Sequence, residues 1–413
     1  MTSRERVLAA IEHKSPDRVP VDLGGTIMTG ISAQALSPYW NYLKESGNVS
    51  NQESLTKAYE LFQMLGEVDD DLVEYLGVDV LPVEPPALFF DINRAKYKPW
   101  TLFDGTKVQV PAQFEIEQAQ NGDWLLHDGG DASKPVVARM PKDGYYFDRI
   151  SDQSLHPTFE PPPLGEMERE YSYLLPNETL DHLAQKAEGL RKTEKALILG
   201  CWLDFAPPSV GSIPDWLCLM ATDPDYVEKL FAIKTNADLN RLENLAKYMG
   251  DKIDLFGVDG VDYGTQRAEL FSPELFARFH KPYYTAINGW IHENTPWKTW
   301  KHTCGSVPHL LPHFIESGLD AINPVQTSAQ GMDAHSLKTR YGHQITFWGG
   351  GVDTQRVLPF STPEEVYRHV ADRIAILSPG GGFVFAAVHN IQAKTPPENI
   401  QAVFQAVQDS AGC

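Results

Sequence analysis

Apolar and polar residues follow one another along this chain in a rhythm of short apolar runs and helical stripes. In the N-terminal part, apolar runs predict strands over 19–23 and 78–83, and stripes predict helices over 3–13, 33–46 and 67–76. Further along, strands are predicted over 196–201, 253–258, 297–302, 321–325, 345–348 and 382–388. Helical patterns separate them over 180–192, 223–248, 273–294, 307–317, 332–341 and 363–377.

The region between residues 100 and 149 has a different texture. The turn sequences FDGT, QNGDW and KDGY separate short alternating stretches, such as 107–110 and 136–139, which is typical of β-hairpins. We expect an inserted β-rich subdomain over 95–175 within a single domain that spans 1–413. Eight strands alternating with helices favour a parallel sheet. At this length they predict an α/β fold, the (β/α)8 TIM barrel, with a β-hairpin insertion after the second strand.

Charge and cysteine content narrow the class of protein. The chain has 55 acidic and 35 basic residues and a formal net charge of -20, which argues against nucleic acid or an anionic membrane as a partner. Its four cysteines are scattered, so a reducing compartment fits better than a disulfide framework. The N-terminus is charged without an apolar leader, and no apolar run is long enough to span a bilayer. We therefore expect a cytoplasmic protein.

Several residues with reactive or metal-binding side chains lie at the predicted carboxyl ends of the strands, where barrel enzymes hold their active sites. In KHTCGS, 301–306, His302 and Cys304 stand two residues apart at a strand end and point to the same side. Imidazole and thiolate are ligands that Zn²⁺ prefers, but this pair is only half a site, and packing or hydrogen bonding is the alternative. Polar residues at the other strand ends are further candidates: Asp22, Asp79, Asp204, Asp262 with Gln266, Gln326, Asp353 and His389.

Several of these candidates have a structural alternative. Asp262 and Gln266 suit substrate orientation, yet Asp262 also suits an Asx-turn, and nearby Asp259 is an alternative functional member. The run GGGVDTQ, 349–355, allows close backbone approach to a ligand that Asp353 contacts, or simply a tight barrel turn. It is neither a P-loop nor G-x-G-x-x-G, so no nucleotide site is expected. Aromatic residues near strand ends suit either a site wall or the core: Trp202, Phe205, Trp216, Tyr263 and Trp348.

Four segments of the chain resemble the uroporphyrinogen decarboxylase superfamily, and most closely its corrinoid-dependent methyltransferase branch. They are RERVLAAIEHKSPDRVPVDLGG, GVDGVDYGTQRAELFSPELFARFHKPYY, the stretch over 302–355 and SPGGGFVFAAVHNIQAKTPPENI. The resemblance implies a TIM barrel and, in the methyltransferases, zinc held by His-x-Cys and a second Cys near the last strand. This chain has no Cys there, and His389 stands in about that place. The implied ligands are therefore His302, Cys304 and His389.

The two branches differ in the loop after the first strand. Decarboxylases carry arginines there that bind the carboxylates of the porphyrinogen. The corresponding residues 22–30, DLGGTIMTG, contain neither Arg nor Lys, which favours the methyltransferase branch. That branch implies zinc-assisted transfer of a methyl group from a small methylated substrate, for example a methyl ether in O-demethylation. A decarboxylase-like lyase and a non-catalytic barrel that binds a small ligand stay open as alternatives.

The methyltransferase reading also assigns partners and roles. The D-x-H-x-x-G pattern of corrinoid domains is absent, so cobalamin is expected on a separate corrinoid protein. His302, Cys304 and His389 are then the catalytic and metal-ligating residues. Substrate positioning falls to Asp22, Asp204, Asp262, Gln266, Gln326 and Asp353. The insertion is open to three uses, which are shaping the pocket, forming a homodimer interface and docking the corrinoid protein. The methyl donor and acceptor are not identified by the sequence.

Overall fold

A parallel sheet of seven strands forms the centre of the computed structural model, which describes residues 1–47, 49, 55–150, 153–200, 203 and 205–412. The strand order is β15-β14-β13-β12-β11-β10-β3, so neighbours along the chain are neighbours in the sheet. The strands are short: β3 (Val80–Val83), β10 (Ala196–Leu199), β11 (Leu255–Gly257), β12 (Lys298–His302), β13 (Ala321–Asn323), β14 (Thr346–Trp348) and β15 (Phe383–Val384).

The segment around Val21 closes this sheet into a barrel. Val21 bridges Phe385 in parallel, directly after β15, and the Asp22 N–H donates to the Phe385 carbonyl at 2.8 Å. On the other side, the Val21 carbonyl accepts the N–H of Asp79, just before β3, at 2.8 Å. The segment thus stands in the eighth strand position, and the predicted TIM-barrel-like fold is confirmed. The strand predicted over 19–23 is reduced to one bridge, because Pro20 has no N–H to donate.

A buried charge cluster holds the closing segment in place. Asp79 is 0% exposed and lies at the amino end of β3, so its prediction as a residue of the carboxyl rim was wrong. Its carboxylate accepts hydrogen bonds from Arg6 at 2.7 Å, from Arg18 at 2.7 and 2.8 Å, and from the Val21 N–H at 2.9 Å. Arg6 belongs to α1 (Ser3–Ile11), which is therefore tied to the closing strand position.

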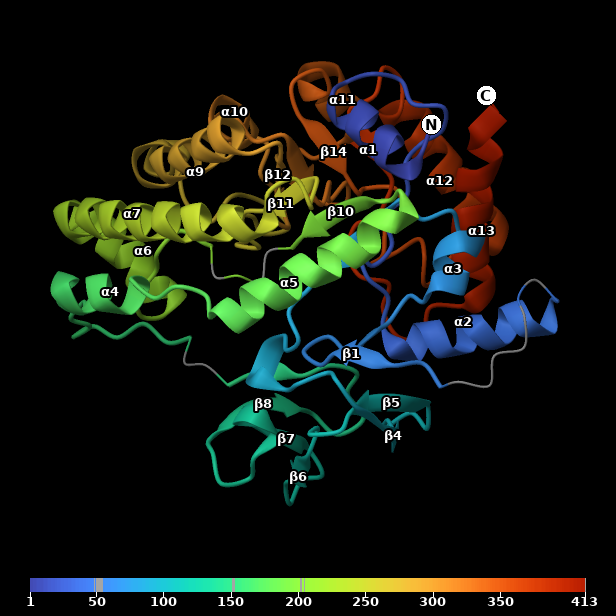
Figure 1. Ribbon diagram of the computed structural model, residues 1–413, viewed down its shortest axis with the longest axis horizontal. Coiled ribbons are helices and arrows are strands. Elements are labelled where there is room, and N and C mark those ends of the chain that lie inside the picture. The colour runs from blue at the N-terminus through green and yellow to red at the C-terminus, as the bar shows by residue number, and fades with distance from the viewer. Residues whose placement is uncertain (48, 50–54, 151–152, 201–202, 204, 413) are drawn as a thin grey trace.

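Helices surround the barrel (Figure 1). They are α2 (Ala33–Glu45), α3 (Asp70–Tyr75), α4 (Leu164–Tyr171), α5 (Asn177–Leu190), α6 (Ile213–Thr222), α7 (Pro224–Met249), α8 (Pro273–Leu275), the π-helical η4 (Phe276–His280), α9 (Lys281–Asn294), α10 (Leu311–Glu316), α11 (Ala334–Tyr341), α12 (Pro363–Leu377) and α13 (Pro397–Asp409). The helix predicted over 307–317 begins only at Leu311, after a turn. In the part of the chain that the structure describes, no helix has the length and apolarity to cross a membrane.

The predicted insertion after the second strand is present and lies below the barrel in Figure 1. It contains β4 (Tyr97–Thr101) paired with β5 (Lys107–Pro111), and a four-stranded antiparallel sheet of β6 (Ile116–Gln118), β7 (Trp124–His127), β8 (Val136–Met140) and β9 (Asp148–Arg149). Phe114, Trp124 and Phe147 belong to its own apolar core. An unpredicted hairpin, β1 (Ala58–Glu60) with β2 (Leu65–Gly66), adjoins it through a bridge between Lys57 and Gln109.

Candidate functional site

Three side chains meet at the carboxyl ends of β12 and β15. His302 ends β12, Cys304 follows it, and His389 comes after β15. One nitrogen or sulfur atom from each residue lies within 4.8 Å of the other two. His302 Nε2 is 3.3 Å from Cys304 Sγ, and the rings of His302 and His389 are 5.4 Å apart between centroids. The three residues that the sequence predicted as ligands therefore converge at one point.

The loop that carries Cys304 is held tightly by backbone geometry and by two side chains. Gly305 has φ +89°, and a Cβ there would lie 2.3 Å from the backbone of Gly264, so only glycine fits. The Cys304 N–H donates to Asp262 Oδ1 at 2.6 Å, and the Gly305 N–H donates to Gln326 Oε1 at 2.8 Å. Asp262 and Gln326, both predicted as substrate residues, thus position the thiol.

Asn323, which the sequence analysis missed, determines how His302 is presented. It ends β13, where it is paired in register with His302. Asn323 Nδ2 donates to the Trp348 carbonyl at 2.9 Å, so its Oδ1 accepts the Nδ1–H of His302 at 2.7 Å. This tautomer leaves the Nε2 lone pair of His302 directed at Cys304. A buried amide behind a histidine is the arrangement that orients metal-ligating imidazoles.

Burial keeps all three converging groups neutral when no metal is bound. It lowers the pKa of His302, and, together with the nearby His302, it lowers the pKa of His389 to about 4. Burial, followed by the charge of Asp262, raises the pKa of the Cys304 thiol. The Asn390 N–H donates to His389 Nδ1 at 2.8 Å, so the proton of the neutral His389 ring lies on Nε2.

Two of the predicted substrate residues are engaged within the protein. Asp22 is buried, where it accepts from Trp348 Nε1 at 2.7 Å and from the Gly25 N–H at 2.8 Å, and burial raises its pKa to about 6. Asp353 Oδ1 accepts the N–H groups of Gln355 and Arg356 at 2.7 and 3.0 Å. This is the turn-forming alternative raised for the glycine-rich loop.

The remaining predicted substrate residues differ in position. Asp262 has a side chain that is 53% exposed, and its Oδ1 lies 3.7 Å from His302 Nε2. Gln266 is exposed, and its carbonyl accepts the Gln330 N–H at 3.1 Å. Asp204 lies outside the described residues, as does Trp202 of the aromatic set. Of the other aromatic candidates, Trp216, Tyr263 and Trp348 are buried in the core.

A buried ion pair lies beside the site. Lys301 and Asp259 are both fully buried and paired through Nζ and Oδ1. Lys301 also donates to the Val261 carbonyl at 3.1 Å, and its ammonium lies over the ring of Tyr263, 4.8 Å from the centroid. Asp259, the alternative to Asp262, is therefore occupied by an ion pair that fixes the loop after β11. The role of Lys301 could not be predicted, because the sequence does not indicate which acidic residue a lysine in a strand will pair with.

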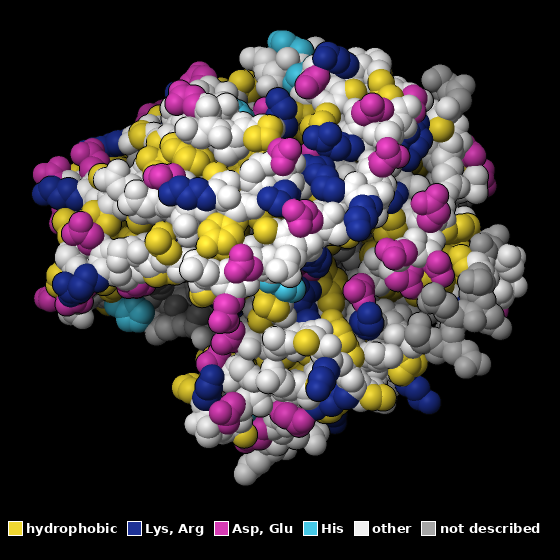
Figure 2. Space-filling view, in the orientation of Figure 1, with side chains coloured by type: hydrophobic (Ala, Val, Ile, Leu, Met, Phe, Trp, Pro, Cys, Tyr) yellow, Lys and Arg dark blue, Asp and Glu magenta, His cyan; other side chains and the backbone are white. Residues whose placement is uncertain are grey.

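A cleft of about 900 Å³ lies between the barrel rim and the insertion. On the face seen in Figure 2, the surface is hollowed between the barrel and the insertion. Asp259 lines the cleft, and its carbonyl accepts the His302 N–H at 3.0 Å. Ile27 also lines it, and the Ile27 carbonyl accepts from Asn390, the neighbour of His389, at 2.8 Å. The cleft therefore borders the residues that support both histidines.

Comparison with known proteins agrees with this architecture. Residues 209–410 match the family model described as uroporphyrinogen decarboxylase (URO-D). No curated protein matches the chain. A methyltransferase from Methanosarcina mazei is 15% identical over 99% of each chain, with a TM-score of 0.56. A GH113 β-1,4-mannanase, 13% identical over 55% of this chain and 79% of its own, has a TM-score of 0.32.

At 15% identity the methyltransferase structure establishes only the fold. The family match is more specific, because residues 209–410 include His302, Cys304 and His389. Residues 209–410, just under half of the chain, are therefore similar to the uroporphyrinogen decarboxylase family.

Proposed function

We propose that this protein is a zinc-assisted methyltransferase that moves a methyl group between a small methylated substrate, such as a methyl ether, and the cobalamin of a separate corrinoid protein. The observation that carries the proposal is the convergence of His302, Cys304 and His389 within 4.8 Å at the carboxyl ends of β12 and β15. The family match over residues 209–410 and the full-length likeness to a methyltransferase support it.

The donor set suits zinc. Imidazole nitrogen and thiolate sulfur bind Zn²⁺ at about 2.0–2.3 Å, which places tetrahedral ligand atoms roughly 3.5 Å apart. His302 Nε2 and Cys304 Sγ are already 3.3 Å apart, and the His302 lone pair is available. The third ligand, His389, is not yet free to bind a metal, because its Nδ1 lone pair accepts the Asn390 N–H. His389 would ligate after that bond is released, and otherwise its Nε2–H is a donor beside the other two residues.

Each residue of the site has a defined task in this proposal. A zinc ion held there would supply Lewis acidity toward a thiol or a leaving heteroatom. Asp262 and Gln326 hold the Cys304 loop, and Asn323 holds His302 in the required tautomer. In the reaction, the bond between methyl carbon and heteroatom breaks and a carbon–cobalt bond forms. The heteroatom keeps the electron pair and takes up a proton.

The charge of the cleft argues against a porphyrinogen substrate. Arg149 is the one Arg or Lys among the described residues that line it, and Asp91 and Asp259 line it too. A tetrapyrrole with several carboxylates needs several guanidinium or ammonium partners. The cleft is therefore better suited to a small neutral or cationic methylated compound.

Metal analysis tests the zinc part of the proposal. We expect about one zinc per chain in the wild type and almost none in Cys304→Ser. Cys218→Ser is the matched control, because Cys218 is an exposed cysteine on α6, outside the three converging residues. Zinc absent from the wild type, or retained in full by Cys304→Ser, would contradict the assignment of the ligands.

A transfer assay tests the reaction itself. The wild type is incubated with free cob(I)alamin and, in turn, methyl ethers, methylamines, methylated thiols and methyl halides, and methylcobalamin formation is followed by its absorbance. Transfer from one of these classes, lost in Cys304→Ser and kept in Cys218→Ser, is the expected result. Transfer at the same rate in Cys304→Ser would remove the thiol from the mechanism.

A further inference from the structure

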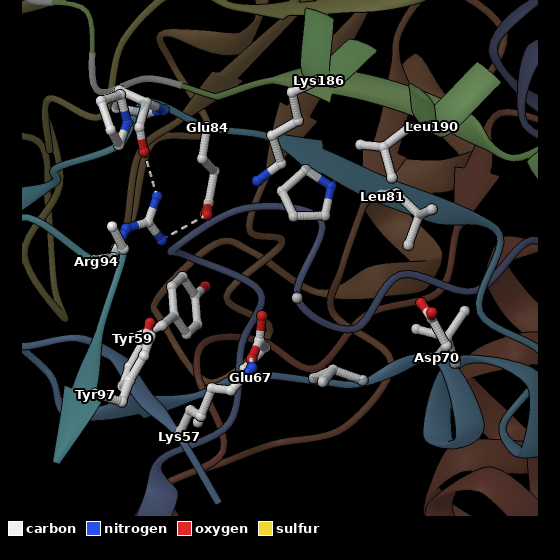
Figure 3. A pocket seen from close by; sticks show the side chains of 18 of the residues that line it. Lys57, Tyr59, Glu67, Asp70, Leu81, Glu84, Arg94, Tyr97, Lys186 and Leu190 are labelled. Atoms are coloured by element: carbon white, nitrogen blue, oxygen red, sulfur yellow. Dashed lines mark hydrogen bonds and ion pairs between the residues drawn. The ribbon is translucent and has the colours of Figure 1, made fainter. Parts of the chain in front are cut away.

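A second cavity, of about 780 Å³, lies apart from the three converging residues, none of which lines it. It lies where the hairpin strand β1, the end of β3, the insertion strands β4 and β5, and α5 approach one another. Figure 3 shows its polar side chains converging on one space from these different elements. Its size is that of a site for a small organic ligand.

Three buried polar atoms of residues that line this cavity have no hydrogen-bond partner among the described residues: the Tyr59 hydroxyl, Glu84 Oε1 and Arg94 Nε. Tyr59 and Glu84 are 7% and 4% exposed, and both line the cavity. Arg94 Nη1 donates to Glu84 Oε2 at 2.9 Å, which leaves Glu84 Oε1 without a hydrogen bond. The Tyr59 hydroxyl is also without one. Buried polar groups are nearly always hydrogen-bonded in folded proteins, so three such atoms at one cavity indicate a missing partner.

Lys186 adds an unpaired positive charge to the same space. It extends from α5 toward Glu84 (Figure 3), and no described residue forms an ion pair or hydrogen bond with its ammonium. The other lysine of the cavity, Lys57, is paired with Glu67 at 2.8 Å. Burial lowers the pKa of Lys186. A partly buried ammonium without a counter-ion favours an anionic partner.

Part of the cavity wall is apolar. Leu81 from β3 and Leu190 from α5 lie beside Lys186 in Figure 3, and Val68 and Val73 also line the cavity. The space is therefore amphiphilic, with an ammonium, a hydroxyl and a free carboxylate oxygen on one side and branched aliphatic side chains on the other.

We propose that this cavity is a second binding site, for a small carboxylic acid that carries a hydroxyl or ammonium group next to its carboxylate and has an apolar body. The carboxylate pairs with Lys186 and accepts from the Tyr59 hydroxyl. The neighbouring donor group binds Glu84 Oε1, and the apolar body packs on Leu81 and Leu190. A phosphate dianion fits less well, because Glu84 belongs to the same polar wall. This site is independent of the methyl transfer proposed above.

Thermal unfolding and calorimetric titration with a matched set of probes test this proposal. The probes are L-leucine, 2-hydroxy-4-methylpentanoate, 4-methylpentanoate and leucinamide, followed by the phenylalanine counterparts of all four. We expect saturable binding and a raised Tm with the amino or hydroxy acid of at least one set at about 10 mM. Weaker binding is expected for the acid without the donor group and for the amide.

Variants then locate the bound acid. Lys186→Met should weaken binding about tenfold or more, which is the loss typical of a charged hydrogen bond. Glu84→Gln should weaken binding of the amino acid more than binding of its deaminated analogue. Lys247→Met is the control, since Lys247 is an exposed lysine paired with Glu243 on α7. Zinc content should stay unchanged in Lys186→Met, which separates this test from that of the proposed function. No binding by any acid of the panel, or equal binding by wild type and Lys186→Met, would overturn the proposal.

Discussion

The hydrogen bond between Asn323 and His302 allows a sharp test of the site. Asn323→Ala removes the acceptor of the His302 Nδ1–H and the donor to the Trp348 carbonyl, both of which are buried. Leaving two buried groups without partners costs about 2–4 kcal/mol of stability. Loss of the residue that orients a ligating histidine lowers metal affinity about 10- to 100-fold, or ~1.4–2.7 kcal/mol.

Asn323→Asp separates these two effects. The carboxylate keeps an acceptor for His302 Nδ1–H but offers no donor to the Trp348 carbonyl. We expect both variants to unfold at lower urea concentration, and only Asn323→Ala to bind zinc more weakly in competition with a chromophoric chelator. Wild-type zinc affinity in Asn323→Ala, or an equal loss in both variants, would refute the role given to the amide.

Three further predictions concern the barrel around the site. Burial raises the pKa of Asp22 from its ordinary 3.8 to about 6, so its stabilising contribution is full below about pH 4 and is lost as the pH rises through 6. Between pH 4 and 7 this shift corresponds to about 2.4 kcal/mol, so urea unfolding over that range should show Asp22→Asn gaining that much relative to the wild type, whereas parallel curves would contradict it. Asp79→Asn leaves Arg6 and Arg18 without their shared carboxylate and should lower the free energy of unfolding by about 3–5 kcal/mol, against less than about 1 kcal/mol for the exposed control Glu12→Gln. Gly305→Ala, whose Cβ would collide with Gly264, should cost about 1–3 kcal/mol and release zinc, while Gly165→Ala, in open space on α4, should do neither.

Most of the barrel could be predicted because parallel strands buried on both faces read as apolar runs. The structure places β10 to β14 inside the predicted ranges, and all are fully or almost fully buried. The last strand is shorter than predicted, with Phe383–Val384 in place of 382–388. Phe385, which follows this strand, forms only an isolated bridge with Val21, so the strand is not extended into a longer ladder. The small hairpin over 58–66 escaped prediction because its strands are too short to show a period.

Only those site residues that stand out by their position next to a predicted strand could be found from the sequence. His302 and Cys304 stood out because two ligand types follow one strand, and His389 because it follows the last one. Asn323 became visible only through the register of β12 and β13, which places it opposite His302. Asp353 was predicted as a substrate residue but forms a turn instead. A carboxylate that follows glycines suits both roles, so the sequence alone could not distinguish them.

The bridge between Val21 and Phe385, which closes the barrel, has a consequence for the order in which the molecule folds. The Gly30 N–H donates to Asn390 Oδ1 at 2.6 Å across 360 positions of the chain, and Val21 meets Phe385 in the same region. Contacts between such distant positions form late, because a long loop must be ordered first. His389 follows Phe385 along the chain, so we expect it to meet His302 and Cys304 late in folding. A metal bound by all three would stabilise only the finished barrel, and its removal should loosen the junction of the first and last strands before any other part.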